Sequence, residues 1–220
     1  MKRPSALLAS LALLVFTAWG CAAAQAATPF ERGQGYNELS ARQPVAHPGK
    51  VVVTEFFWYN CPHCNALEPE LDAWARKLPP YVVLQRVPIA FTAQFVPQQK
   101  LYYTLRALGR DGALQPAIFQ AIHQQHILLN TPEQMATWLA AHGIARQTFL
   151  STYNSFGVAM RASQATRMMK AYGIDGVPTL AVQGTYEVSG DLPQTPTDDR
   201  ILQAVDYLIA RVHAQQTQAN

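Results

Sequence analysis

Two cysteines separated by two residues are the strongest chemical signal in this sequence, in the run Cys61-Pro62-His63-Cys64. A pair at this spacing can act as a redox dithiol or supply half of a zinc site, so the spacing alone leaves the chemistry open. A disulfide across two intervening residues closes too short a loop to constrain the unfolded chain strongly. The pair is therefore better explained by thiol chemistry than by structural stabilisation.

The sequence around this pair predicts a strand before it and a helix after it. Val51 to Phe57 is apolar and β-branched at its start, which is typical of a buried central strand. Pro62 suits the first turn of a helix. Apolar residues spaced by three and four then follow: Leu67, Leu71, Trp74, Ala75 and Leu78. At a helix N-terminus, free N–H groups and the helix dipole stabilise a thiolate. We therefore expect Cys61 to be the exposed, attacking sulfur, and Cys64, one turn deeper, to close the ring with it or resolve a mixed disulfide.

Two further side chains could tune this pair. His63 could stabilise the Cys61 thiolate by its positive charge or by N–H donation, or it could be an exposed loop histidine with no role. A stabilised thiolate favours the reduced form, so the disulfide form would pass its oxidation to a substrate.

Glu55 interrupts the buried strand, where a charge is unexpected. Buried beneath the disulfide, its carboxyl would have a raised pKa and could exchange a proton with Cys64; the alternative is an outward-facing glutamate at a strand end.

A metal-binding module is the main alternative reading of the cysteine pair. His123 and His126 would supply two further ligands. The gap between the two pairs is far longer than in zinc fingers, and the histidine spacing is shorter than the usual three to five intervening residues. We therefore predict no metal site and expect both histidines on one exposed helix face.

A helical block interrupts an α/β pattern in the middle of the chain. Tyr81 to Ile89 reads as a second buried strand. Residues 96–172 then show helical spacing and no convincing strand. Within this block, Thr131-Pro132-Glu133-Gln134 predicts a helix start, with threonine as the N-cap and proline at the first helical position.

Strand character returns after the helical block. Thr179 to Val182 and Thr185 to Val188 form a predicted hairpin, and Asp198 to Val212 closes the pattern as an amphipathic helix. The two flanking halves, about 28–93 and 173–220, should form one sheet, because closing a longer loop costs little more than closing a short one.

The N-terminal segment is typical of a secretory signal peptide. Met1-Lys2-Arg3 is positive, Leu7 to Trp19 is apolar, and small residues follow. The apolar run falls short of the roughly 20 residues that span a bilayer. We therefore predict that residues 1–26 are removed on export, leaving two cysteines. A retained N-terminal anchor and a lipid anchor at Cys21, which follows a poor lipoprotein signal, are the alternatives.

The bulk composition excludes some partners. Apolar residues make up 49 % of the 220 residues and charged residues 14 %, an ordinary globular balance. The net charge of +3 is weak, and the charges are interspersed, so we predict no nucleic-acid binding. No long exposed apolar helix stands out, and we expect a monomer.

These motifs together resemble the DsbA family of bacterial periplasmic thiol:disulfide interchange proteins, in the thioredoxin superfamily. The resemblance rests on Glu55-Phe56-Phe57, the Cys61–Cys64 run, the helical insertion and Gly176-Val177-Pro178, and it covers residues 28–213. It implies an α/β thioredoxin fold with an inserted all-helical domain. Residues 27–93 and 173–220 would be the two parts of the thioredoxin-like domain, and residues 94–172 the insertion.

The resemblance also implies a function and partners. It implies a periplasmic oxidase that donates its disulfide to newly exported unfolded proteins through a mixed disulfide at Cys61. No cofactor beyond the redox-active disulfide would be needed, and a DsbB-like membrane oxidase would restore it. It implies that the Val177-Pro178 bond is cis and faces the disulfide, that the Val177 backbone pairs with an extended substrate, and that Glu55 matches the family's buried acid.

Two alternatives to an oxidase stay open at this stage. One is a disulfide reductase or isomerase, against which the lack of a dimerisation domain and the Pro62-His63 pair argue. The other is a non-catalytic peptide-binding or chaperone module that uses the same groove. It predicts that replacing both cysteines would leave function intact.

Overall fold

The fold is built on one five-stranded sheet, described by a computed structural model over residues 30–218. The predicted signal peptide and Cys21 lie outside the described residues. The strand order is β1-β5-β4-β2-β3, with β2 and β3 parallel and the other pairs antiparallel. The strands are β1 (Asn37–Glu38), β2 (Val51–Phe57), β3 (Val82–Pro88), β4 (Thr179–Val182) and β5 (Tyr186–Ser189).

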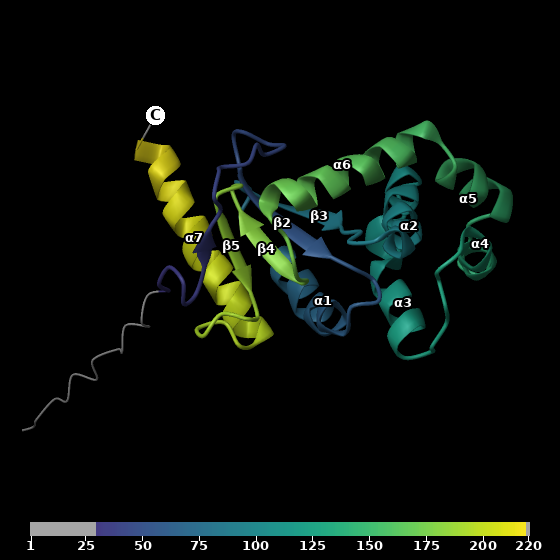
Figure 1. Cartoon of the computed structure of the whole chain (residues 1–220), viewed down its shortest axis with the longest axis horizontal. Coiled ribbons are helices and arrows are strands. Elements are labelled where there is room, and N and C mark those ends of the chain that lie inside the picture. The colour runs from purple at the N-terminus through teal and green to yellow at the C-terminus, as the bar shows by residue number, and fades with distance from the viewer. Residues whose placement is uncertain (1–29, 219–220) are drawn as a thin grey trace, which may run out of the picture.

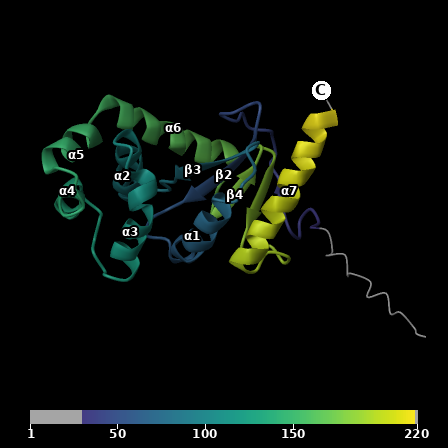
Figure 2. The same cartoon turned by 180° about the vertical axis from the view of Figure 1, so that it is seen from behind.

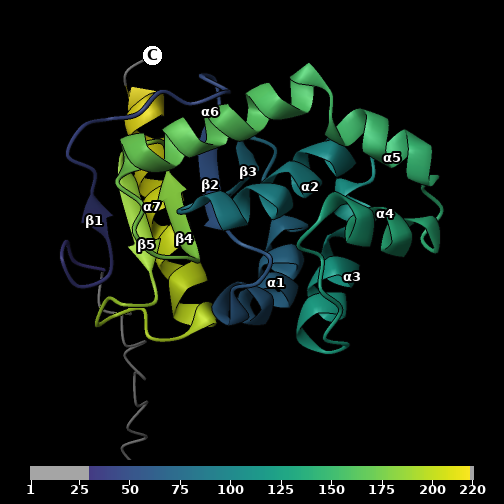
Figure 3. The ribbon, with the colours of Figure 1, turned by 45° about the vertical axis from the view of Figure 1, so that its right-hand side comes forward.

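The described residues form seven helices in addition to this sheet. Two of them, α1 and α7, cover one face of the sheet (Figure 2), and the helices α2 to α6, which lie between β3 and β4 in the chain, form a block beyond its end (Figure 1). The C-terminal part of α6 packs on the opposite face (Figure 3) through Tyr172, whose ring centroid lies 5.0 Å from that of Phe56. The helices are α1 (Pro62–Ala75), α2 (Val96–Ala107), α3 (Asp111–His123), α4 (Pro132–Ala140), α5 (Arg146–Tyr153), α6 (Phe156–Tyr172) and α7 (Asp198–Gln218), with a short 3₁₀ turn at Ala93–Phe95.

This arrangement confirms the predicted fold class, a thioredoxin fold that carries a helical insertion. The two flanking halves do form one sheet, and every residue of β2 is buried, as expected for a central strand. The helix α4 begins at the predicted capping box, in which Gln134 N donates to Thr131 Oγ1 and Thr131 N donates to Gln134 Oε1.

The largest differences from the predicted elements concern β1, α1 and α7. The strand β1 was not predicted, because two polar residues carry no local strand signal and pair only through β5. The helix α1 ends at Ala75, so Leu78 lies outside it although its spacing continues the helical pattern. The helix α7 runs to Gln218, beyond the predicted end at Val212. No helix within residues 30–218 is long and apolar enough to cross a bilayer.

Candidate active site

The two cysteines lie at the start of α1, directly after the turn that follows β2. Cys61 is the N-cap of the helix and Pro62 occupies its first turn. Both thiols are free, and the Cys61 Sγ accepts a hydrogen bond from the Cys64 backbone N–H at 3.4 Å and donates to the Val177 carbonyl at 3.2 Å. The structure thus brings Val177 to the cysteine pair, although it lies 116 residues from Cys61 in the chain.

Burial distinguishes the two sulfurs less sharply than the sequence led us to expect. Cys61 is 7 % exposed and Cys64 is 1 % exposed, while Pro62 and His63 are exposed. The expectation of an exposed Cys61 is therefore wrong as stated. The physical reason is the approach of the loop that holds Val177, since its carbonyl lies within hydrogen-bond distance of the sulfur. Cys61 is still the more accessible of the two.

The electrostatics of the pair are strongly asymmetric. The pKa of Cys61 is lowered to about 6, chiefly by a hydrogen bond from the Cys64 side chain, with further help from the backbone N–H groups of Cys64 and His63. The charge of His63 contributes least among these favourable causes. Burial raises the pKa of Cys64, and its interaction with Cys61 raises it further. One sulfur is therefore suited to be a thiolate and the other a thiol.

The loop opposite the cysteines begins β4 and contains a cis Val177-Pro178 bond, as the family resemblance implies. A pocket of about 250 Å³ lies between this loop and α1, and His63, Val177, Pro178, Asp191 and Asp198 are among the residues that line it. A second pocket, of about 400 Å³, is lined by Trp58, Asn60, Phe95 and Gln98, among others. Asn60 precedes Cys61 and His63 follows it by two residues, so each pocket is lined by a residue close to the attacking sulfur in sequence.

Glu55 is a buried member of a charged network beneath this surface. It is 1 % exposed in β2, directly opposite Arg86 in the register of β3, and its Oε2 lies 3.3 Å from Arg86 Nε. The Arg86 guanidinium also binds Glu68 at 2.7 Å and Asp72 at 2.6 Å, both from α1. Burial raises the pKa of Glu55 to about 8 despite the opposing charge of Arg86, and the charge of Glu55 in turn raises the pKa of Cys64.

The sequence reasoning missed the partners of Glu55. Arg86 is one of the half-buried central residues of β3, where an arginine looks like an ordinary surface residue. Glu68 and Asp72 are four residues apart and so share one face of α1. That spacing, together with Glu55 in a buried strand, was the available signal for a counter-charge.

Replacing Glu55 with glutamine is expected to stabilise the protein, increasingly so as the pH rises. The folded pKa of about 8 exceeds the ordinary value of 4.5, so between these values the native state holds a proton that the unfolded chain has released. The wild-type free energy of unfolding therefore falls with pH in that window, and the variant lacks this loss. The difference in free energy of unfolding between Glu55→Gln and wild type should open above about pH 4.5 and level off above about pH 8.

Urea unfolding at several pH values measures this gap. The control is Glu70→Gln, on an exposed position of α1, which should behave as the wild type at every pH. A gap between Glu55→Gln and wild type that does not change with pH would contradict the assignment of a raised pKa.

The two histidines considered as metal ligands do not share a helix face. His123 is the last residue of α3 and its Nε2 lies 2.8 Å from the Tyr59 carbonyl oxygen, whereas His126 follows the helix with a φ of 55° and is exposed. The expectation of one exposed face is wrong because α3 ends between them. In the described part of the chain, no group of three or more histidine, cysteine or acidic residues could hold a metal ion.

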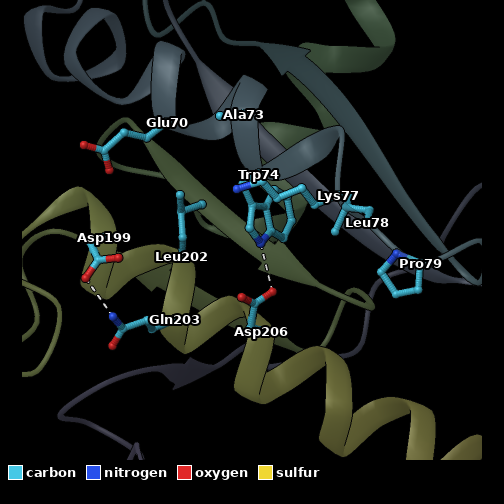
Figure 4. A pocket seen from close by; sticks show the side chains of 10 residues that line it. All are labelled: Glu70, Ala73, Trp74, Lys77, Leu78, Pro79, Asp199, Leu202, Gln203 and Asp206. Atoms are coloured by element: carbon cyan, nitrogen blue, oxygen red, sulfur yellow. Dashed lines mark hydrogen bonds between the residues drawn. The ribbon is translucent and has the colours of Figure 1, made fainter.

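A pocket of about 470 Å³ lies away from the cysteines, between α1 and α7 (Figure 4). Trp74 Nε1 donates to Asp206 Oδ1 at 2.8 Å across it, which ties the two helices together. None of the residues predicted to do chemistry lines this pocket. We therefore place the candidate active site at Cys61 and Cys64.

Comparisons with known proteins agree with this placement. A family model described as a DSBA-like thioredoxin domain matches residues 52–201. The chain is 41 % identical over 211 residues to a thiol:disulfide interchange protein DsbA of Burkholderia cepacia, covering 94 % of this chain and 96 % of the relative. It is 43 % identical over 184 residues to the protein of the same name from Azotobacter vinelandii, covering 84 % and 85 %. The crystal structure of Pseudomonas aeruginosa DsbA superposes with a TM-score of 0.79 at 38 % identity, covering 86 % of this chain and 97 % of that one.

Proposed function

The chain belongs to the DsbA-like family of thiol:disulfide oxidoreductases, and we propose that its working group is the Cys61–Cys64 disulfide, which it donates to newly exported unfolded proteins. The observation that carries this proposal is the opposite shift of the two thiol pKa values at one helix start. A low pKa at Cys61 stabilises the reduced pair and so makes the disulfide form an oxidant.

The transfer takes two exchange steps. A substrate thiolate attacks the Cys61 sulfur, the more accessible one, so that a substrate–Cys61 disulfide forms and the Cys61–Cys64 bond breaks. Cys64 leaves and takes up a proton, and Glu55, which is protonated below its pKa of about 8, is the group we assign to supply it. A second substrate thiolate then attacks the substrate sulfur of the mixed disulfide and expels the Cys61 thiolate, whose low pKa makes it a good leaving group.

The loop around Val177 supports a role in holding the substrate chain. The Val177 carbonyl already accepts from Cys61 Sγ, so a substrate segment whose cysteine is joined to Cys61 would run alongside this residue. An extended segment can pair with the backbone there by strand addition, and Pro178 would shape the same edge. The pockets lined by His63 and by Asn60 would receive the residues that flank the substrate cysteine.

The location and partners of the protein follow from the same proposal. We propose that it acts as a monomer in the periplasm after removal of residues 1–26. A DsbB-like membrane oxidase would then accept two electrons from the reduced pair and restore the disulfide. In this proposed cycle the Cys61–Cys64 disulfide is the redox group, with no metal and no bound cofactor.

The equilibrium of the pair with glutathione, measured over a range of pH on protein lacking residues 1–26, tests the oxidase proposal. In the reduced protein the Cys61 pKa is about 6 against an ordinary value of 9.0, so the thiolate stabilises the folded state fully above about pH 9 and loses that effect as the pH falls through 6. The pair should be far more oxidising than thioredoxin, whose potential is roughly −270 mV. The thiolate absorbance should titrate near pH 6.

A pair as reducing as thioredoxin, with a Cys61 thiolate that titrates near pH 9, would move the protein to the reductases. The matched control is the oxidised protein, whose ultraviolet absorbance should show no such transition.

A further inference from the structure

The turn that joins β2 to α1 is held by the helical insertion. This turn consists of Trp58, Tyr59 and Asn60, and it carries the chain directly into Cys61. Its fully buried Tyr59 donates through its hydroxyl to Gln115 Oε1 of α3 at 2.7 Å. The Asn60 side chain accepts from Gln98 of α2 at 2.7 Å. The thioredoxin-like part therefore shares its redox turn with α2 and α3.

His123 makes a different kind of contact with this turn. Gln98 and Gln115 bind side chains of the turn, whereas His123 Nε2 lies 2.8 Å from a main-chain atom, the carbonyl oxygen of Tyr59. A carbonyl oxygen can only accept, so Nε2 must carry the proton. The imidazole also stacks on Phe119, with ring centroids 6.1 Å apart and an interplanar angle of 25°. The ring is thus placed by α3 and directed at the backbone of the turn.

The backbone of this turn contacts the Cys61 backbone and the Cys64 sulfur. The Cys61 N–H donates to the Trp58 carbonyl at 3.0 Å, which fixes the entry into α1. Burial is the main cause of the raised pKa of Cys64, whereas a hydrogen bond from the Trp58 backbone N–H lowers that pKa. A shift of the Tyr59 peptide plane would therefore move groups that act on both cysteines.

We propose that His123 is a positioning residue for thiol–disulfide exchange, acting from the insertion through its hydrogen bond to the Tyr59 carbonyl. This role rests on the proposed action of Cys61 as the attacking thiol. Without the donor, the turn is free to relax, and the N–H groups that stabilise the Cys61 thiolate are less well placed. The reduced pair is then less stable relative to the disulfide, and the protein becomes a weaker oxidant.

Two substitutions separate the hydrogen bond from packing. His123→Phe keeps an aromatic ring against Phe119 but cannot donate. His123→Gln loses the ring but places an amide N–H at the same number of bonds from Cα. The matched control is His142→Phe: His142 also lies in the insertion, shortly after the end of α4, stacks on Trp138 with ring centroids 3.7 Å apart, and hydrogen-bonds through Nδ1 to the Trp138 carbonyl at 2.8 Å.

The readout is the equilibrium in which the protein disulfide and two glutathione thiols form the protein dithiol and glutathione disulfide. In His123→Phe, the constant for this reaction should fall by about fivefold, the equivalent of one hydrogen bond, and the Cys61 pKa should rise. His123→Gln and His142→Phe should keep the wild-type constant. If His123→Phe does not fold, His123→Leu takes its place, since it lacks the ring as His123→Gln does but cannot donate a hydrogen bond; equal constants in His123→Leu and His123→Gln would overturn the proposal.

Other outcomes are also decisive. Equal shifts in both His123 variants would assign the effect to packing, and no shift in either would remove His123 from the reaction. A wild-type protein whose Cys61 is not acidic would instead refute the proposed function, whatever the variants do.

Discussion

A protein in which Cys61 is replaced by serine is expected to lose disulfide transfer altogether. Without the Cys61 sulfur no internal disulfide can form, and Cys64 is too buried to form a mixed disulfide that a substrate thiolate could attack. The rate of oxidation of a peptide with two cysteines should fall by on the order of 10³ or more, to the uncatalysed rate. Stopped-flow fluorescence or timed acid quenching of the peptide oxidation measures this loss.

The Cys64→Ser variant is the matched control, because it separates attack from resolution. Its Cys61 thiolate can still attack glutathione disulfide, forming a protein–glutathione disulfide and releasing one glutathione thiolate. With no Cys64 to displace it, this adduct should accumulate as one glutathione per chain in the mass spectrum. Cys61→Ser should form no adduct.

An adduct on Cys61→Ser but not on Cys64→Ser would reverse the assigned roles. Full function in a protein lacking both cysteines would favour the peptide-binding module instead.

The elements that the sequence predicts well are those with a local physical signal. The strand β2 is buried on both faces, so its apolar run needs no knowledge of its neighbours. The helix α4 starts where one threonine and one glutamine cap each other within three residues. By contrast, β1 is two residues long and exists only because β5 lies beside it.

The same distinction explains the active site. The cysteine pair is visible because its spacing and the strand and helix around it are local. Glu55 is visible because a charge in a buried strand is anomalous. Arg86 and His123 are not visible, since their partners lie far away in the sequence: His123 is 64 residues from Tyr59. Only the fold shows that the insertion contacts the redox turn.

Replacing Arg86 with methionine is expected to cost the largest amount of stability of any single charge change at this site. Its guanidinium faces three carboxylates, of which those of Glu55 and Glu68 are almost fully buried. Glu55 already holds a proton below about pH 8, so without Arg86 it is chiefly Glu68 and Asp72 that must either stay charged and unpaired or take up protons. Breaking a buried ion pair by removing one partner costs about 3–5 kcal/mol at neutral pH.

The loss of stability in Arg86→Met should depend on pH. Removing Arg86 takes away the charge that lowers the pKa values of Glu55 and Glu68 in the folded state, so both pKa values should rise further above 4.5. The folded variant then binds protons that its unfolded chain releases above about pH 4.5. Wild type already holds the Glu55 proton up to about pH 8, so the contribution of Glu55 to the deficit should grow only above that pH, and that of Glu68 only above its own raised pKa; urea unfolding at several pH values will show this.

Arg32→Met is the matched control for the loss of an arginine from an ion pair. Arg32 lies 3.1 Å from Glu38, but its side chain is 68 % exposed, so this pair should contribute at most about 1 kcal/mol. A loss in Arg86→Met no larger than that in Arg32→Met would mean that the three carboxylates do not depend on Arg86. Adding Glu55→Gln to Arg86→Met should recover part of the loss, because it removes one of the acids left without a partner.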